Sequence, residues 1–294
     1  MKDIRYPIVS GKFYPSQPKA LTEMIETCFI QATKRLPVIS SNPPSKPIGL
    51  VVPHAGYEFS GRVSAWAYDA LAKDGLPDIV VIIGPNHTGL GSSIALMVEG
   101  SWKTPLGEVP IDKEFATLLN QDMIDTDRVA HQYEHSIEVQ LPFLQYLYQK
   151  AKKNFSFVPL CMSVQDLRAA TSVGKLIANA IRGTKKNVFV IASSDFSHVG
   201  FNYMSMPPRG IPVNKWAESQ DNKAITGILA LDERELIETV SKNNITMCGY
   251  GPVAAMLVAL KNLGASEAKL ITYSSSYEVM PGDSCVGYAA IILK

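Results

Sequence analysis

Three of the five histidines in this chain follow directly on short apolar runs. His54 comes after "GLVVP", His87 after "IVVIIGPN", and His198 after "VFVIASSDFS", with Asp195 three residues before it. Open α/β sheets build their binding sites beyond the carboxyl ends of their strands. A single loop histidine is more often inert, but three in equivalent places favour a site that holds a metal ligand or a catalytic base on a rigid scaffold.

The other two histidines lie in "HQYEH", which matches the H-x-x-E-H pattern of zinc proteases. That pattern requires a helix, on which residues four apart share one face. Here Ser136 is typical of a helix N-cap and the apolar periodicity begins at Ile137, so the pair is predicted to lie in a turn before the helix. We interpret His135, beside Glu134, as a site residue, and His131 as a residue behind the site or on the surface.

Cys248 lies in the glycine-rich stretch "ITMCGYGP", which suggests a tight turn at the start of a helix. A helix N-terminus lowers the pKa of a thiol from about 8.5 and favours the thiolate, which binds metals or attacks carbon. The alternative is a buried structural cysteine, and both interpretations stay open for Cys248. We assign the structural role to Cys28, Cys161 and Cys285.

The elements that must position these residues alternate along the chain. A first helix is expected at about 19–34, and the proline-rich "SSNPPSKP" joins it to the first core strand. Runs rich in Val and Ile predict buried strands at 48–52, 79–83, 155–160, 188–192, 270–273 and 286–292. Helices are expected at 62–73, 114–120, 137–150, 166–181, 215–229, 233–243 and 253–263, with Pro142 kinking the third or marking its first turn.

This alternation predicts a single α/β domain over residues 1–294, with a central, mostly parallel sheet flanked by helices. The stretch "SWKTPLGEVPID" is expected to be a hairpin-like insertion. The glycines of "GPNHTGLGSS" lack the spacing of a phosphate-binding loop, so we interpret them as turn residues that let the backbone approach the site. "SSDFS" lacks the G-x-S-x-G frame, which disfavours a serine hydrolase.

Composition excludes several classes of partner. The chain has 294 residues, is 46% hydrophobic and has a formal net charge of +1, which gives no electrostatic reason to expect nucleic acid or an anionic membrane as a partner. No apolar run approaches the roughly 20 residues that span a bilayer. The N-terminus lacks the apolar segment of a signal peptide, and the cysteines form no C-x-x-C pair. We therefore expect a soluble, cytoplasmic protein without a disulfide framework.

Five ordered motifs, "PHAGYEFSG", "GPNHTG", "EHSIEVQLPFL", "SSDFSH" and "TMCGYGP", together with "GKFYP" near the N-terminus, resemble those of the Memo family. The resemblance runs from about residue 5 to the C-terminus. It implies the fold of class III extradiol dioxygenases, which use non-haem iron held by two His and a carboxylate. It also implies that His54 and His87 are the metal histidines, and that Cys248 falls where the dioxygenases have their Glu.

The same resemblance implies that His135, Asp195 and His198 are pocket residues on the substrate side. We therefore expect a metal-binding, redox-active protein in which two histidines and Cys248 bind one iron(II) or copper ion, with zinc as a further option, because a thiolate in place of a carboxylate changes the preferred metal. His135 and His198 are expected to transfer protons, and Asp195 to orient a neighbour.

Two other functions stay open. A non-catalytic scaffold would retain a vestigial pocket and recognise a peptide or protein partner. A zinc hydrolase would use metal-bound water as its nucleophile. The sequence fixes neither the small-molecule or peptide ligand nor the oligomeric state.

Overall fold

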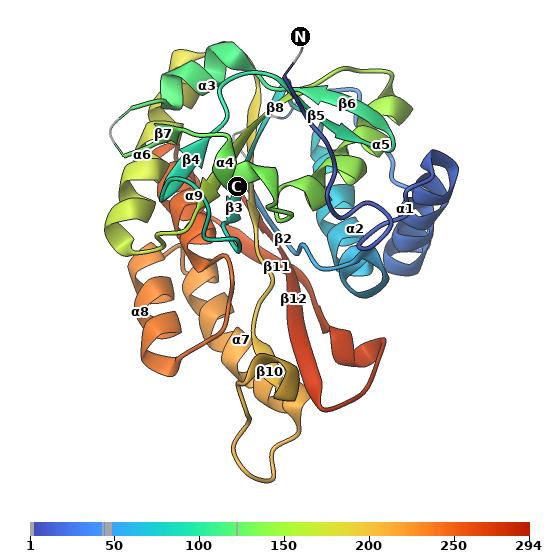
Figure 1. Cartoon of the computed structure of the whole chain (residues 1–294), viewed down its shortest axis with the longest axis vertical. Coiled ribbons are helices and arrows are strands. Elements are labelled where there is room, and N and C mark those ends of the chain that lie inside the picture. The colour runs from blue at the N-terminus through green and yellow to red at the C-terminus, as the bar shows by residue number, and fades with distance from the viewer. Residues whose placement is uncertain (1–2, 43, 45–48, 122) are drawn as a thin grey trace.

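The computed structural model describes residues 3–42, 44, 49–121 and 123–294. Its large sheet contains β2 (Gly49–Val52), β3 (Ile79–Pro85), β4 (Ile94–Leu96), β7 (Asp125–Thr126), β8 (Ser156–Met162), β9 (Val188–Ser193), β10 (His198–Gly200), β11 (Ala268–Ser275) and β12 (Ser284–Leu293). The order is β10-β12-β2-β9-β3-β8-β4-β7, and β11 pairs with β12 (Figure 1). The central strands β2, β9, β3 and β8 are parallel, whereas β12 and β4 join them in antiparallel pairs.

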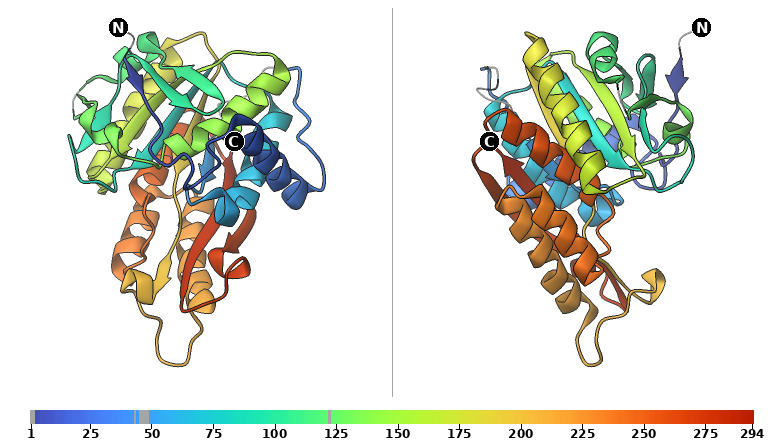
Figure 2. Two further views of the ribbon diagram at one scale, coloured as in Figure 1. Left: turned by 45° about the vertical axis from the view of Figure 1, so that its right-hand side comes forward. Right: turned by 90° about the vertical axis from the view of Figure 1, so that its left-hand side faces the viewer.

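Helices cover both faces of this sheet (Figure 2). They are α1 (Pro18–Thr33), α2 (Tyr57–Asp74), α3 (Lys113–Leu119), α4 (Val129–Gln132), α5 (Leu141–Ala151), α6 (Leu167–Gly183), α7 (Val213–Leu229), α8 (Glu233–Asn243) and α9 (Tyr250–Asn262), with single 3₁₀ turns η1 (Glu138–Gln140), η2 (Phe201–Tyr203) and η3 (Ser276–Glu278). Helix α9 packs on β9 and β3 with α6 and α8 beside it, and α7 packs on β12. Helix α2 packs on β2, β11 and β12, and α1 and α5 pack on α2. None of the helices in the described ranges is long and apolar enough to cross a membrane.

A smaller sheet contains the expected insertion. Strands β5 (Ser101–Thr104) and β6 (Gly107–Pro110) form an antiparallel hairpin, as predicted for "SWKTPLGEVPID". Strand β1 (Ile4–Arg5) pairs with β5 in parallel, which the sequence did not indicate. The N-terminal segment is thereby tied to the insertion.

The predicted fold class, a single α/β domain with a central, mostly parallel sheet flanked by helices, is confirmed. Each expected helix and strand is present, with ends within a few residues of those predicted. Residue 48, the predicted start of the first core strand, lies outside the described residues, as do 43 and 45–47. Pro142 lies in the first turn of α5, as one of the two alternatives predicted. The extent of the domain, residues 1–294, stays a prediction.

The helix start predicted at Ser136 is wrong. The 3₁₀ turn η1 precedes α5, and no side chain caps either of them. The Ser136 hydroxyl is buried and instead donates a hydrogen bond to the carbonyl of Pro85 at the end of β3, at 2.9 Å. Gly84 permits this approach, because a Cβ there would lie 2.5 Å from Ser136 Oγ.

A buried carboxylate fixes the N-terminal segment to the rest of the molecule. Glu138 accepts hydrogen bonds from the Arg5 guanidinium at 2.5 Å, from the Tyr14 hydroxyl at 2.6 Å, and from the backbone N–H groups of Ile8 and Val9. Arg5 also stacks over the ring of Trp102, 4.2 Å from its centroid. Because both charges are buried, removing one leaves the other without compensation.

A second buried carboxyl supports the segment between β9 and β10. Asp221 on α7 accepts hydrogen bonds from the Ser197 N–H and the Tyr273 hydroxyl, both at 2.8 Å. Gly287 on β12 leaves the space for it, since a Cβ there would lie 1.8 Å from Asp221 Oδ2. Burial outweighs these hydrogen bonds and raises the pKa of Asp221 to about 6.

We expect Glu138→Ala to lower the free energy of unfolding by about 3–5 kcal/mol, because it leaves the Arg5 charge buried and unpaired. Urea denaturation followed by circular dichroism measures this. The matched control is Glu238→Ala, which removes an exposed i,i+4 pair with Arg234 and should cost at most about 1 kcal/mol. Equal losses in the two variants would contradict the structural role of Glu138.

Asp221 should also make stability depend on pH. Its folded pKa of about 6 exceeds its ordinary value of 3.8, so the stability that its protonated form confers is present below pH 3.8 and is lost as the pH rises through 6. Asp221→Asn cannot ionise at this position. As the pH rises across this range, the free energy of unfolding of the wild type should therefore fall by about 2–3 kcal/mol relative to that of the variant. Urea denaturation at several pH values measures the difference. A difference that does not change with pH would contradict the raised pKa.

Candidate metal centre

Three parallel strands bring the predicted residues to one edge of the sheet. In the β2–β9 pair Val52 lies opposite Ser193, and in the β3–β9 pair Ile83 lies opposite Ala192, so the three strands end at the same level. His54 follows β2, separated from it by Pro53, and His87 follows β3. The sequence argument from strand ends therefore placed these two histidines correctly.

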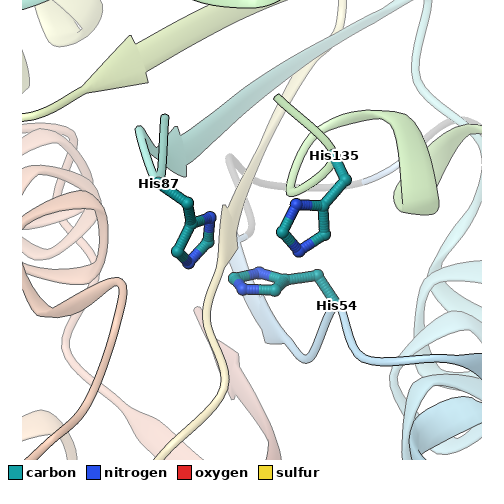
Figure 3. A group of neighbouring side chains, drawn as sticks. All are labelled: His54, His87 and His135. Carbon is teal, nitrogen blue, oxygen red and sulfur yellow. The ribbon is translucent and has the colours of Figure 1, made fainter. Parts of the chain in front are cut away.

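Three imidazoles meet at this edge. His54, His87 and His135 each offer a ligand atom, and these atoms all lie within 4.8 Å of one another. The ring centroids are 5.2 Å apart for His54 and His87, 5.5 Å for His54 and His135, and 4.8 Å for His87 and His135. Figure 3 shows the three rings around a common space, reached from three separate segments of the chain. Such a group can bind a metal ion, since imidazole nitrogen suits zinc, copper and iron.

The hydrogen bonds of His54 fix the ring nitrogen that carries its proton. Nδ1 of His54 lies 2.9 Å from Ser193 Oγ. That hydroxyl donates its one proton to the carbonyl of Ser136 and accepts from the side-chain amide of Gln140, so it can only accept from Nδ1–H. Burial lowers the pKa of His54 well below its ordinary value, and the neighbouring imidazoles add to this effect. The ring is therefore neutral, with the lone pair on Nε2.

One buried carboxylate faces the other two imidazoles. Glu134 Oε1 lies 3.0 Å from His87 Nδ1 and 3.4 Å from His135 Nδ1. Burial by itself would raise the pKa of Glu134, but its hydrogen bond and charge interaction with His87 outweigh this and lower the pKa to about 2. For His87, burial lowers the pKa, and the contact with Glu134 outweighs it and raises the pKa overall. The pKa of His135 is lowered, chiefly by burial.

Cys248, predicted as the third ligand, lies against His54. Its Sγ is 3.2 Å from His54 Nε2 and accepts a hydrogen bond from the Asp195 N–H at 3.3 Å. It precedes α9, as expected, but the predicted lowering of its pKa is wrong, because burial and then the Asp195 carboxylate raise the pKa of this thiol. In the described ranges Cys248 is not a member of the group whose ligand atoms all lie within 4.8 Å. Its role as a ligand stays a prediction.

The other three cysteines, Cys28, Cys161 and Cys285, are buried, as expected for structural residues. All four cysteines of the chain are free thiols.

His198 and Asp195 lie on another side of the same pocket. His198 Nδ1 is 2.9 Å from the carbonyl of Phe196 and 3.0 Å from that of Thr246. Because carbonyls only accept, Nδ1 carries a proton. The Asp195 carboxylate accepts a hydrogen bond from the His54 N–H at 2.7 Å, and burial raises its pKa against the opposing charge of His198.

His131 lies apart from this group. It is on α4, whereas His135 follows the end of that helix, so the two do not share a helical face, as predicted. The side chain is fully buried, which contradicts a surface position. Its Nε2 lies 3.2 Å from the carbonyl of Ala95 and its ring packs against Trp102. His131 therefore supports the structure behind the segment that carries His135.

The group opens into a pocket of about 520 Å³. The N-terminal segment supplies Phe13, whose ring lies 5.0 Å from that of His135. Five of the predicted site residues line the pocket: His54, His87, His135, Asp195 and His198. Aromatic, apolar and polar neighbours complete the lining, among them Lys12, Phe13, Phe59, Tyr203, Met280 and Tyr288. The pocket is therefore large enough for a small molecule in contact with the imidazoles.

Sequence reasoning missed three residues that hold the imidazoles in place. Glu134 was noted only as a neighbour of His135, and Ser193 and Thr246 were not singled out. The one available signal was an acidic residue directly before a candidate histidine in the sequence. Ser193 and Thr246 carry no such signal, because contacts over 139 and 48 residues of sequence bring them to the site.

Comparisons with known proteins give the relatives of this chain. The family model for "Memo-like protein" matches residues 5–292. A MEMO1 family protein of Methanopyrus kandleri is 47% identical over 296 residues, covering 99% of each chain. One from Methanocaldococcus jannaschii is 46% identical over 303 residues, covering 100% of each. A solved structure of an uncharacterized protein from Escherichia coli K12 matches with a TM-score of 0.52 at 14% identity, covering 84% of this chain and 99% of that one, and supports the fold alone.

Proposed function

The chain belongs to the Memo-like protein family, and from this premise and the geometry of the pocket we propose that it is a metal-binding, redox-active protein that holds one iron or copper ion. One observation carries the proposal. Three imidazoles from separate segments converge within 4.8 Å, with Ser193 facing Nδ1 of His54 and Glu134 facing Nδ1 of His87 and His135. Imidazoles arranged in this way fit a transition-metal ion.

His54, His87 and His135 are the proposed nitrogen donors, and Cys248 supplies a thiolate beside them. Its Sγ lies 3.2 Å from His54 Nε2, comparable to the separation of about 3–4 Å between a nitrogen and a sulfur donor of one ion. A nearby cation favours the thiolate and so offsets the burial that keeps this thiol protonated. The thiolate is a soft donor, which favours copper(I) and iron over magnesium or calcium.

The remaining pocket residues then act on a small molecule beside the ion. When bound, the ion would supply one-electron exchange. Two carbonyls hold the Nδ1–H of His198, so in its neutral form this ring can accept a proton on Nε2 from a ligand in the pocket. The Asp195 carboxylate holds the backbone of His54 in place by accepting a hydrogen bond from the His54 N–H. Phe13 and Tyr288 add aromatic walls to the pocket.

Metal content should separate the donors from their neighbours. We expect His54→Ala, His87→Ala and His135→Ala to remove most of the metal from anaerobically purified protein, and Cys248→Ser to weaken binding sharply, because a neutral hydroxyl replaces an anionic donor. His131→Gln is the matched control and should keep nearly all of it, since His131 lies outside the group. Elemental analysis by mass spectrometry measures this. Equal metal content in wild type and Cys248→Ser would exclude the thiol as a ligand.

The redox role needs its own measurement. The copper-loaded protein should lose its copper(II) electron paramagnetic resonance signal on addition of ascorbate and regain it in air over repeated cycles. His198→Ala should keep the metal and slow reoxidation by about 10²-fold or more, because general acid–base assistance is typically worth about 10²–10⁴ in rate. A protein that binds only zinc, or copper that does not respond to the reductant, would contradict the redox role and favour a binding protein with a vestigial pocket.

A further inference from the structure

We infer that Glu134 is a positioning residue that sets the tautomer and orientation of two metal-binding imidazoles at once. The inference rests on the proposed metal site and adds to it a carboxylate that touches no ion. It concerns His87 and His135, the two rings that face Glu134. Outer carboxylates of this kind fix the tautomer of a ligating histidine and raise its basicity.

Both carboxylate oxygens of Glu134 accept hydrogen bonds. Oε2 accepts from the His87 N–H at 2.5 Å. Oε1 accepts from the N–H groups of His135 and Ser136, both at 2.8 Å, and lies 3.0 Å from His87 Nδ1. An ionised carboxylate only accepts, so His87 Nδ1 must carry a proton, and in the neutral ring the lone pair is then on Nε2, where it can bind a metal. His135 Nδ1 lies 3.4 Å from Oε1, where the charge of the carboxylate favours a proton on the same nitrogen.

Glu134 also links two segments that are far apart in the sequence. His87 follows β3 and His135 follows α4, 48 residues later in the sequence. Their rings stack with an interplanar angle of 24° and a centroid separation of 4.8 Å. Glu134 is fully buried, and Arg5 donates a hydrogen bond to its carbonyl at 2.6 Å. No bulk water therefore competes for the carboxylate, which strengthens these hydrogen bonds.

The substitution Glu134→Leu isolates this role. Leucine has a similar size but offers no hydrogen-bond acceptor. Both imidazoles face Oε1 of Glu134, so both lose the acceptor that faces Nδ1.

Long-range ¹H–¹⁵N correlation spectra of the metal-free full chain, labelled with ¹⁵N-histidine, read the tautomers directly at a pH of about 8, where unperturbed imidazoles are neutral. We expect the Nδ1–H form for His54, His87, His135 and His198 in the wild type. In Glu134→Leu, His87 and His135 should change to the Nε2–H form, the commoner one in water. His54 and His198, whose acceptors are other groups, should not change and serve as internal controls.

Cobalt(II) titration, followed by its visible absorption, measures the consequence for the metal. The dissociation constant should rise by about 10–100-fold in Glu134→Leu. Asp112→Leu makes the same change at the buried N-cap of α3, beside Ser156 at the opposite end of β8 from the pocket, and should leave the constant unchanged. If Glu134→Leu does not fold, Glu134→Asp keeps the charge but shortens the side chain, and should weaken the 3.0 Å contact with His87 Nδ1.

The outcomes separate this inference from the proposed function. Unchanged tautomers of His87 and His135 in the Glu134 variants, or a dissociation constant equal to that of the wild type, would overturn the role of Glu134. A wild-type protein that takes up no cobalt(II), iron or copper would overturn the metal site, and the tautomers would still decide whether Glu134 orients the two rings.

Discussion

The parallel pairing of β9 with β2 on one side and β3 on the other is the constraint on which the site depends. Parallel strands in register end together, so residues that directly follow them share one edge of the sheet. His54, His87 and Asp195 are all placed in this way. The strands themselves are buried on both faces beneath helices, which makes their ends rigid. A histidine at such a position needs no large rearrangement to bind an ion.

The pocket imidazoles share one feature, although different groups produce it. A serine hydroxyl, a carboxylate and a pair of backbone carbonyls each face an Nδ1 atom. All three are acceptors, so in a neutral ring each holds the proton on Nδ1 and leaves the lone pair on Nε2. The Ser193 hydroxyl acts as an acceptor there because it donates its own hydrogen bond to the backbone carbonyl of Ser136. The chemical state of the rings is therefore set by residues outside the pocket as much as by the histidines.

The sequence allowed the fold and part of the site to be predicted, for reasons of range. Buried strands and helices follow from local apolar periodicity, and the ends of those strands located His54 and His87. The segment around His135 is irregular and is held by Arg5 and Glu138, more than 120 residues apart in the sequence, so no local pattern reveals its position. The pKa of Cys248 was mispredicted because the local effect of a helix end is weaker there than burial, which depends on the whole fold.

The spacing of the proposed donors along the chain determines when the protein could bind a metal. Residues 54, 87, 135 and 248 come from segments that meet only when the sheet is complete, so a partly synthesised or partly opened chain offers no such group. Loading with metal must then follow folding, through the open pocket. An ion bound by donors from these separate segments would stabilise the folded sheet. At a free concentration 100 times its dissociation constant, it would add about 2.7 kcal/mol to the free energy of unfolding. Metal supply would in this way change the fraction of molecules that are folded.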